Sequence, residues 1–188
     1  VLALERYVDA TGDRAVLQQE NVRQGVGEIL EKLAARRHPE TALYETFLQP
    51  TDDERVYPYL TYNNALVWRA LSALARLYPE RAALAEEAEA VRRAVREHCV
   101  KMGEDGAPYF AWSVDLAGGS DVYDEPPGSL QLLAELGFCE PEDPVWRNTV
   151  ALIRSPAYRY SFAGLPFAEI GCPHAPHPWL LSVANSLL

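Results

Sequence analysis

The sequence has little sulfur and a shortage of positive charge. Its 188 residues include three cysteines and one methionine, and 17 Lys and Arg residues stand against 27 Asp and Glu residues. The formal charge of -10 disfavours a nucleic-acid partner, because duplex binding relies on a basic surface. No apolar run approaches the roughly 20 residues of a membrane span, so we expect no membrane partner.

The cysteines are odd in number, and none lies in a CxxC pair; they are Cys99, Cys139 and Cys172. This pattern excludes a disulfide scaffold and a zinc site, and it favours a reducing compartment, the cytoplasm. The sequence also lacks the GxxxxGK[ST], GxGxxG, HExxH and GxSxG motifs of nucleotide-binding proteins, zinc proteases and α/β-hydrolases. We therefore expect no metal and no cofactor.

The composition is that of one folded domain. Hydrophobic residues make up 48% of the chain and charged residues 23%. The sequence opens on Val1-Leu2-Ala3-Leu4, which is typical of a helix interior, and it closes on Leu187-Leu188 without a capping residue. We predict a single α-helical domain over residues 1–188, truncated at both ends.

Hydrophobic residues recur with helical spacing along most of the chain. Helices are predicted from about residue 22 to 33, over 63–78, 80–101, 129–138 and 143–154, and over 179–188. The predicted apolar faces include Ile29 in the first helix, Leu71 and Leu74 in the second, and Leu84, Ala88, Val91 and Val95 in the third. Only the aromatic-rich residues 107–114, with Gly118-Gly119 after them, predict a short strand or hairpin. Since strands do not alternate with the helices, the pattern favours an all-α toroid or bundle over an α/β fold.

An acidic segment precedes the predicted helix at residue 63. Asp52, Asp53 and Glu54 stand next to each other, and Tyr62 and Asn64 follow shortly after them. Carboxylates that are buried together cannot all stay ionised, so one of them could act as a general acid. Tyr and Asn side chains suit stacking on sugars and hydrogen bonding to them. The alternative is that an Asp merely caps a turn or a helix.

Two further segments combine acidic, aromatic and histidine residues. Asp124 and Glu125 lie in a loop bounded by prolines, where Asp124 could instead cap the next helix. His174 and Trp179 lie in a proline-rich stretch that is typical of a rigid binding loop, although a structural histidine is the alternative. Carboxylates, aromatic rings and amides on the loops of a helical scaffold suit carbohydrate, whose glycosidic bond is cleaved by two carboxyl groups.

These three blocks, in this order, resemble glycoside hydrolase family 125, the metal-independent exo-α-1,6-mannosidases. The resemblance rests on residues 48–71, on residues 124–137 and on residues 148–174. It implies an (α/α)6 toroid, or a large part of one, with a short aromatic-rich hairpin, and an inverting reaction on an oligosaccharide substrate. It also implies that the acid lies in the Asp52-Asp53 pair, of which we prefer Asp53. Because loops and helix entries carry the site of a toroid, we predict that the substrate is bound in one cleft with these aspartates by Tyr62, Asn64, Asp124, Glu125, His174 and Trp179.

The sequence departs from the family pattern at three points. Gln49 replaces a basic residue, Cys172 replaces a serine, and the His-Glu-Gly-Phe type segment that carries the family's general base is absent. The isolated chain is therefore expected to lack the base. Two alternatives stay open: another (α/α)6 glycosidase acting on glucosides or small glycosyl compounds, and a non-catalytic carbohydrate-binding helical module.

Overall fold

The structure is mainly helical. A computed structural model describes all 188 residues. Its α-helices are α1 (Leu2–Thr11), α2 (Glu20–Ala34), α3 (Thr61–Leu77), α4 (Ala83–His98), α5 (Pro144–Ile153) and α6 (Leu180–Asn185). Three 3-10 helices join them, η1 (Ala15–Gln18), η2 (Pro126–Gly128) and η3 (Leu130–Leu133). The strands are short: β1 (Tyr59–Leu60), β2 (Val100–Met102), β3 (Pro108–Phe110) and β4 (Ser113–Val114).

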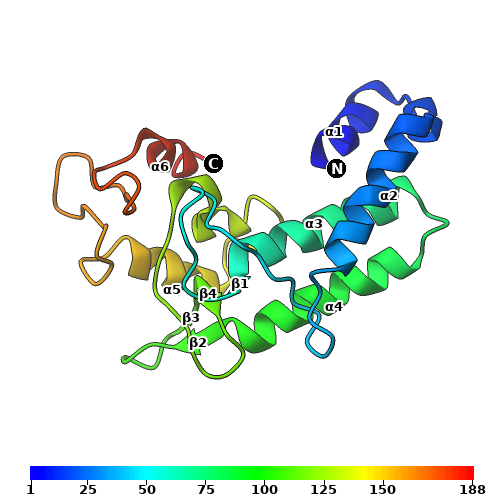
Figure 1. Cartoon of the computed structure of the whole chain (residues 1–188). Coiled ribbons are helices and arrows are strands. Elements are labelled where there is room, and N and C mark those ends of the chain that lie inside the picture. Colours follow the sequence, from blue (N-terminus) through cyan, green and yellow to red (C-terminus); the bar gives the residue numbers. More distant parts are fainter.

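Helices α3 and α4 form the centre of the molecule as an antiparallel pair (Figure 1). Their facing sides are apolar at helical spacing, which is why they pack. On α4 all four residues of the predicted inner face are buried, and on α3 the predicted Leu71 and Leu74 are buried with Leu77. The buried α4 residues are Leu84, Ala88, Val91 and Val95.

Helices α1 and α2 lie at one end of the molecule and α6 lies at the other (Figure 1). Ion pairs join α1 to α3, because the buried Glu5 carboxylate lies 2.5 Å from Arg69 and 2.8 Å from Arg76. Helix α2 is largely exposed: Val26 is buried, but Ile29 of the predicted apolar face is 39% exposed. No helix is both long enough and apolar enough to cross a membrane.

The segment at 107–114, predicted as a short strand or hairpin, contains two short strands, β3 and β4, which do not pair with each other. Strand β3 pairs with β2, and β4 pairs with β1 in a second antiparallel sheet. The hairpin turn lies at residues 103–107, where Gly106 has a φ of +78°, which favours glycine. Pairing β1 with β4 joins the acidic segment to the aromatic one, and it places Trp112 in the core.

Three predicted helices are shorter in the structure. The helix at 80–101 ends at His98, because the next residues leave it as β2 and the Cys99 carbonyl accepts from Ala111. Residues 129–138 form only η3 and turns. The Trp146 indole donates to the carbonyls of Leu130 and Gln131, which an α-helix would use itself. The last helix covers 180–185 of the predicted 179–188.

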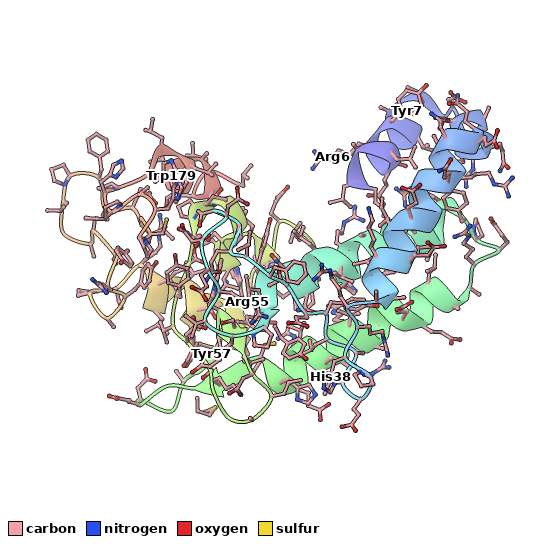
Figure 2. The ribbon with its side chains drawn as sticks, in the orientation of Figure 1. Arg6, Tyr7, His38, Arg55, Tyr57 and Trp179 are labelled. Atoms are coloured by element: carbon pink, nitrogen blue, oxygen red, sulfur yellow. The ribbon has the colours of Figure 1, made fainter.

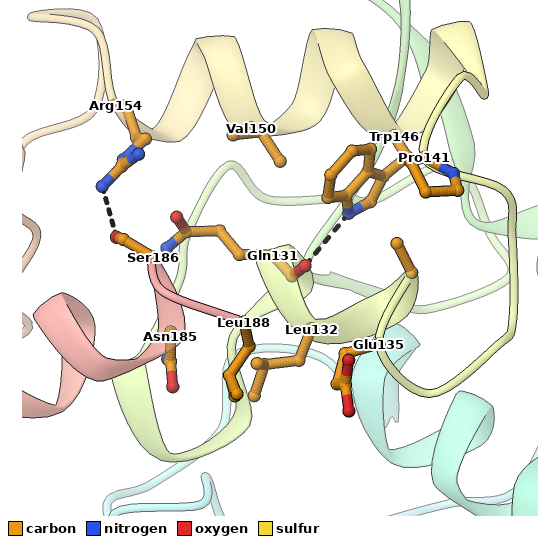
Figure 3. Close-up of a pocket in the computed structure, with 11 residues that line it drawn as sticks. Gln131, Leu132, Glu135, Pro141, Trp146, Val150, Arg154, Asn185, Ser186 and Leu188 are labelled. Carbon is orange, nitrogen blue, oxygen red and sulfur yellow. Dashed lines mark hydrogen bonds between the residues drawn. The ribbon is translucent and has the colours of Figure 1, made fainter.

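Helix α6 encloses a hollow of about 280 Å³ with α5 and η3 (Figure 3). The Trp146 indole donates to Gln131 at 3.2 Å on one side of this hollow, and the Arg154 guanidinium donates to Ser186 at 2.5 Å on the other. None of the site residues predicted from the sequence lines it.

The packing of α3 against α4 predicts where shortening a side chain lowers the stability of the fold most. We expect Leu74→Ala to lower the free energy of unfolding by about 2–5 kcal/mol, because Leu74 is fully buried and its loss leaves a cavity. Urea unfolding followed by circular dichroism measures the change. Ile29→Ala is the control and should cost under about 1 kcal/mol, since Ile29 is exposed. Equal losses would contradict this packing.

Candidate active site

The acidic segment forms a tight turn at residues 49–53, within the irregular connection between α2 and β1. The Gln49 amide donates to the Asp53 carbonyl at 2.8 Å, and the Asp52 amide donates to the Gln49 carbonyl at 3.0 Å. Asp52 has a φ of +64°, a left-handed conformation that aspartate tolerates better than most residues. The Trp112 indole donates to the Gln49 side chain at 2.8 Å, which ties the turn to the core.

The two aspartates of the turn face different hollows. Asp53 lines one of about 300 Å³, together with Tyr123, Pro173 and His174. Asp52 lines another of about 420 Å³, which contains Tyr62. The two carboxylates are therefore not interchangeable, although sequence reasoning treated them as a pair.

Asp53 lies against the proline-rich segment of residues 170–179, which we call the histidine loop. His174 Nδ1 is 3.6 Å from Asp53 Oδ2, and the two side chains are 54% and 44% exposed. The His174 ring stacks on Trp179 with 6.4 Å between ring centroids and 20° between planes. Trp179 stands just before α6 (Figure 2). The fold thus brings Asp53 to the pair of His174 and Trp179, which lies more than 100 residues further along the sequence.

Glu125 connects the turn to the segment before η2. Its carboxylate accepts from the Thr51 amide at 3.1 Å, from the Thr51 hydroxyl at 2.9 Å and from the Tyr123 hydroxyl at 2.7 Å. The side chain has no exposed surface. We call Glu125 with these three donors the Glu125 clamp. It fixes the backbone of the turn two residues before Asp53.

Burial dominates the electrostatics around the clamp. Loss of hydration raises the pKa of Glu125, the hydrogen bonds from Tyr123 and Thr51 oppose this effect, and the nearby charge of Asp53 adds to it. Burial also raises the pKa of Tyr123 well above its ordinary range, as does its bond to Glu125. Tyr123 therefore remains a neutral donor at any ordinary pH.

The neighbouring Asp124 faces inward. Its carboxylate accepts from the Ser129 hydroxyl at 2.6 Å and from the Leu130 amide at 2.8 Å, which is the capping role that the sequence left open. Burial raises its pKa to about 7, against the effect of these two donors. Asp124 therefore holds the start of η3 from a position with no exposed surface.

Asn64 is buried as well. Its oxygen accepts from the Tyr44 amide at 2.7 Å, and its nitrogen donates to the carbonyls of Tyr44 and Leu60 at 3.1 and 2.9 Å. These bonds hold the long connection against the start of α3. Asn64 thus supports the fold around the turn and has no surface that faces either hollow.

The histidine loop is attached to the same segment from the other side. The Tyr158 hydroxyl donates to the Asp124 carbonyl at 2.6 Å and lies 3.2 Å from the Gly171 carbonyl. A Cβ atom on Gly171 would lie 2.4 Å from the carbonyl oxygens of Ala175 and His177, so only glycine fits there. This close packing fixes the direction in which His174 leaves the loop.

Three residues that organise the site are not among the site residues predicted from the sequence: Thr51, Tyr123 and Tyr158. Thr51 lies two residues before Asp53, and its Oγ1 is 3.1 Å from Asp53 Oδ2. The sequence around Tyr158 does not indicate its role, because its partner Asp124 lies 34 residues away. Tyr123 lies two residues from its partner Glu125, but the spacing alone does not show that the two side chains meet.

A helical scaffold that gathers a carboxylate, a histidine and aromatic rings on adjoining loops is the architecture of an α-helical glycosidase. The sequence matches the family described as metal-independent alpha-mannosidase (GH125) over residues 18–188. The chain belongs to this family of glycoside hydrolases. No curated protein matches it.

A solved structure from Streptococcus pneumoniae shares the fold. It is described as a metal-independent alpha mannosidase in a non-productive substrate complex with alpha-1,6-mannobiose. It matches with a TM-score of 0.70 and 20% sequence identity. The match covers 79% of this chain and 38% of the S. pneumoniae chain, so this chain spans less than half the length of its structural relative.

The buried Asp124 predicts how stability depends on pH. Its pKa is 3.8 ordinarily and about 7 in the fold, so between these values the folded chain keeps a proton that the unfolded chain has released. The free energy of unfolding should therefore fall by a few kcal/mol as pH rises from 4 to 7, at about 1.4 kcal/mol for each pKa unit.

Asp124→Asn should flatten this dependence, because the amide cannot ionise and still accepts from the Leu130 amide. Urea unfolding at several pH values between 4 and 8 measures the slope. Glu31→Gln, which changes an exposed carboxylate on α2, should keep the wild-type slope. A wild-type slope in Asp124→Asn would refute the assignment.

Proposed function

We propose that the protein is an inverting exo-α-1,6-mannosidase in which Asp53 is the general acid. The single observation that carries this proposal is the position of Asp53, whose carboxylate lines an open hollow beside His174, the ring on which Trp179 stacks. The family match supports α-mannoside chemistry. The mannobiose complex of the S. pneumoniae relative supports an oligosaccharide substrate with an α-1,6 linkage.

Asp53 is preferred to its neighbours on accessibility. A general acid must approach the glycosidic oxygen within about 2.6–3.2 Å, so its carboxyl must be open to substrate. Asp53 is 44% exposed within its hollow, whereas Asp124 and Glu125 are fully buried and engaged by donors. Asp52 is exposed but belongs to the other hollow.

The aromatic neighbours suit a sugar. Trp179 presents an apolar face that is extended by the stacked His174 ring, and Tyr123 forms part of the wall of the hollow. Sugar rings present C–H faces that pack on such surfaces, while their hydroxyl groups bond to imidazole and carboxylate. We propose that His174 and Trp179 bind the mannose unit next to the scissile bond.

An inverting reaction also requires a second carboxylate that activates water, with about 6.5–9.5 Å between the two carboxyl groups. Glu125 and Asp124 are unsuited to this role because they are buried and hydrogen-bonded. We propose that the base comes from the part of the family domain that these 188 residues do not contain. The helices described here then form part of an (α/α)6 toroid that the remainder completes.

Replacement of the acid tests the proposal. In the full-length protein, Asp53→Asn should lower kcat on α-1,6-mannobiose by roughly 10²–10⁴-fold, the usual contribution of general acid catalysis. The loss on an activated aryl α-mannoside should be much smaller, because its leaving group departs with little help from a proton. Steady-state kinetics on both substrates measure the two effects.

Asp52→Asn is the matched control, since it changes the adjacent carboxylate that faces the other hollow. It should not reproduce the dependence on the leaving group. Equal losses on both substrates in Asp53→Asn would mean that Asp53 is structural. Absence of any α-mannosidase activity in the wild-type protein would overturn the proposed function itself.

A further inference from the structure

The hollow that Asp52 lines adjoins the hollow that Asp53 lines. The first has a volume of about 420 Å³ and the second about 300 Å³, and Gln49 forms part of the wall of both. The Cα atoms of consecutive residues such as Asp52 and Asp53 are about 3.8 Å apart. A substrate whose linkage reaches Asp53 can therefore extend past the turn into the hollow of Asp52.

Phe47 gives the hollow of Asp52 an exposed aromatic surface. Its side chain lines this hollow and is 64% exposed. The Arg36 guanidinium lies over the ring, 3.6 Å from its centroid. This cation–π contact covers one face of the ring and holds it in place. The opposite face of Phe47 is left for a ligand to pack on.

Tyr62 supplies the same hollow with a hydroxyl that the protein does not use. The residue is only 9% exposed, and its ring packs on Gly128, where a Cβ atom would lie 2.9 Å from Tyr62 Cδ1. The hydroxyl has no hydrogen-bond partner in the protein, although polar groups at this depth are nearly always paired. Burial raises the pKa of Tyr62, and the charge of Asp124 adds to this effect, so the hydroxyl is a neutral donor.

The polar groups of the hollow favour a neutral ligand that is rich in hydroxyl groups. Asp52 is the one charged residue that lines it, which disfavours an anion, and the nearby Arg36 offsets that charge. The Asn63 amide nitrogen donates to the Thr46 hydroxyl at 3.1 Å, which leaves the Asn63 oxygen to accept. A sugar has hydroxyl groups for Tyr62 and Asn63, and it has a C–H face for the exposed ring.

We propose that the hollow of Asp52 binds a sugar unit of the leaving group, with its pyranose ring packed on Phe47 and a hydroxyl group bonded to Tyr62. The inference rests on the proposed function, in which Asp53 protonates the linkage and His174 and Trp179 hold the terminal mannose. The rest of the oligosaccharide then lies beyond the linkage, and the adjoining hollow receives it. Phe47 and Tyr62 thereby set a preference for oligosaccharides over simple mannosides.

The test compares α-1,6-mannotriose with α-mannosyl fluoride in the full-length protein. Mannotriose carries two sugar units on the leaving-group side, and the fluoride carries none. Phe47→Ala should raise KM for mannotriose about tenfold, because it removes the surface on which the sugar packs. The value of kcat should stay near that of the wild type, since this contact is the same in the bound substrate and in the transition state. On α-mannosyl fluoride both constants should stay those of the wild type.

Tyr62→Phe keeps the packed ring and removes only the hydroxyl. It should raise KM for mannotriose by about 3–10-fold, the value of one neutral hydrogen bond. Phe167→Ala is the matched control, because it removes a phenylalanine that is 71% exposed and lines neither hollow. It should leave both constants unchanged on both substrates.

Two kinetic results would overturn the inference and leave Asp53 as the acid. One is an unchanged KM for mannotriose in both Phe47→Ala and Tyr62→Phe. The other is an equal change on mannotriose and on α-mannosyl fluoride in these variants, which would mean that the two residues act on the whole site.

A binding measurement separates this inference from the proposed reaction. Isothermal titration calorimetry on Asp53→Asn protein, in which turnover is slow, gives the Kd of mannotriose. Adding Phe47→Ala should raise this Kd about tenfold, and adding Phe167→Ala should leave it unchanged. Equal Kd values in all three proteins would overturn the sugar site. A raised Kd in a protein whose wild type lacks α-mannosidase activity would support the sugar site and contradict only the proposed reaction.

Discussion

The candidate site depends on the burial of one carboxylate. Glu125 has no exposed surface, and a buried charge is tolerated only when hydrogen bonds replace the water that it has lost. Thr51 and Tyr123 supply those bonds, and Thr51 belongs to the turn that presents Asp53. Moving the turn would leave Glu125 without two donors. The hydrogen bonds that the buried Glu125 carboxylate requires therefore also fix the position of Asp53.

Further contacts hold the turn and the segment that carries Glu125 in place. The Trp112 indole holds the turn through Gln49, and Gly128 allows Pro50 to approach the backbone, where a Cβ atom would lie 2.5 Å from the Pro50 ring. Tyr158 links the segment that carries Glu125 to the histidine loop. No strand pairing or shared helix connects these three loops to one another. Their relative positions are therefore fixed by side-chain contacts.

The sequence predicted best what depends on local periodicity. The buried face of α4 was predicted residue by residue, because helical spacing alone determines it. The pairing of the strands could not be predicted, because the partner of residues 113–114 lies more than 50 residues upstream at β1. The end of the helix predicted at 129–138 depends on Trp146, whose indole takes carbonyls that an α-helix would need.

The same division applies to the site. The three loops that carry it were predicted from their residue types, and Asp53 and His174 do meet. Periodicity and composition could not separate Asp52 from Asp53, because the hollow that each side chain lines depends on the backbone path of the turn, which is left-handed at Asp52. Nor could they show that Asn64 and Asp124 turn inward, because each is satisfied by main-chain groups that the fold supplies.

A crystal structure of the full-length protein with a non-hydrolysable thio-linked α-1,6-mannobiose tests the central claim most directly. The account predicts that the sulfur between the sugars lies within hydrogen-bonding distance of the Asp53 carboxyl, in the hollow of His174, with the Glu125 clamp intact. A disaccharide whose linkage lies in the hollow of Asp52, or away from both aspartates, would contradict it.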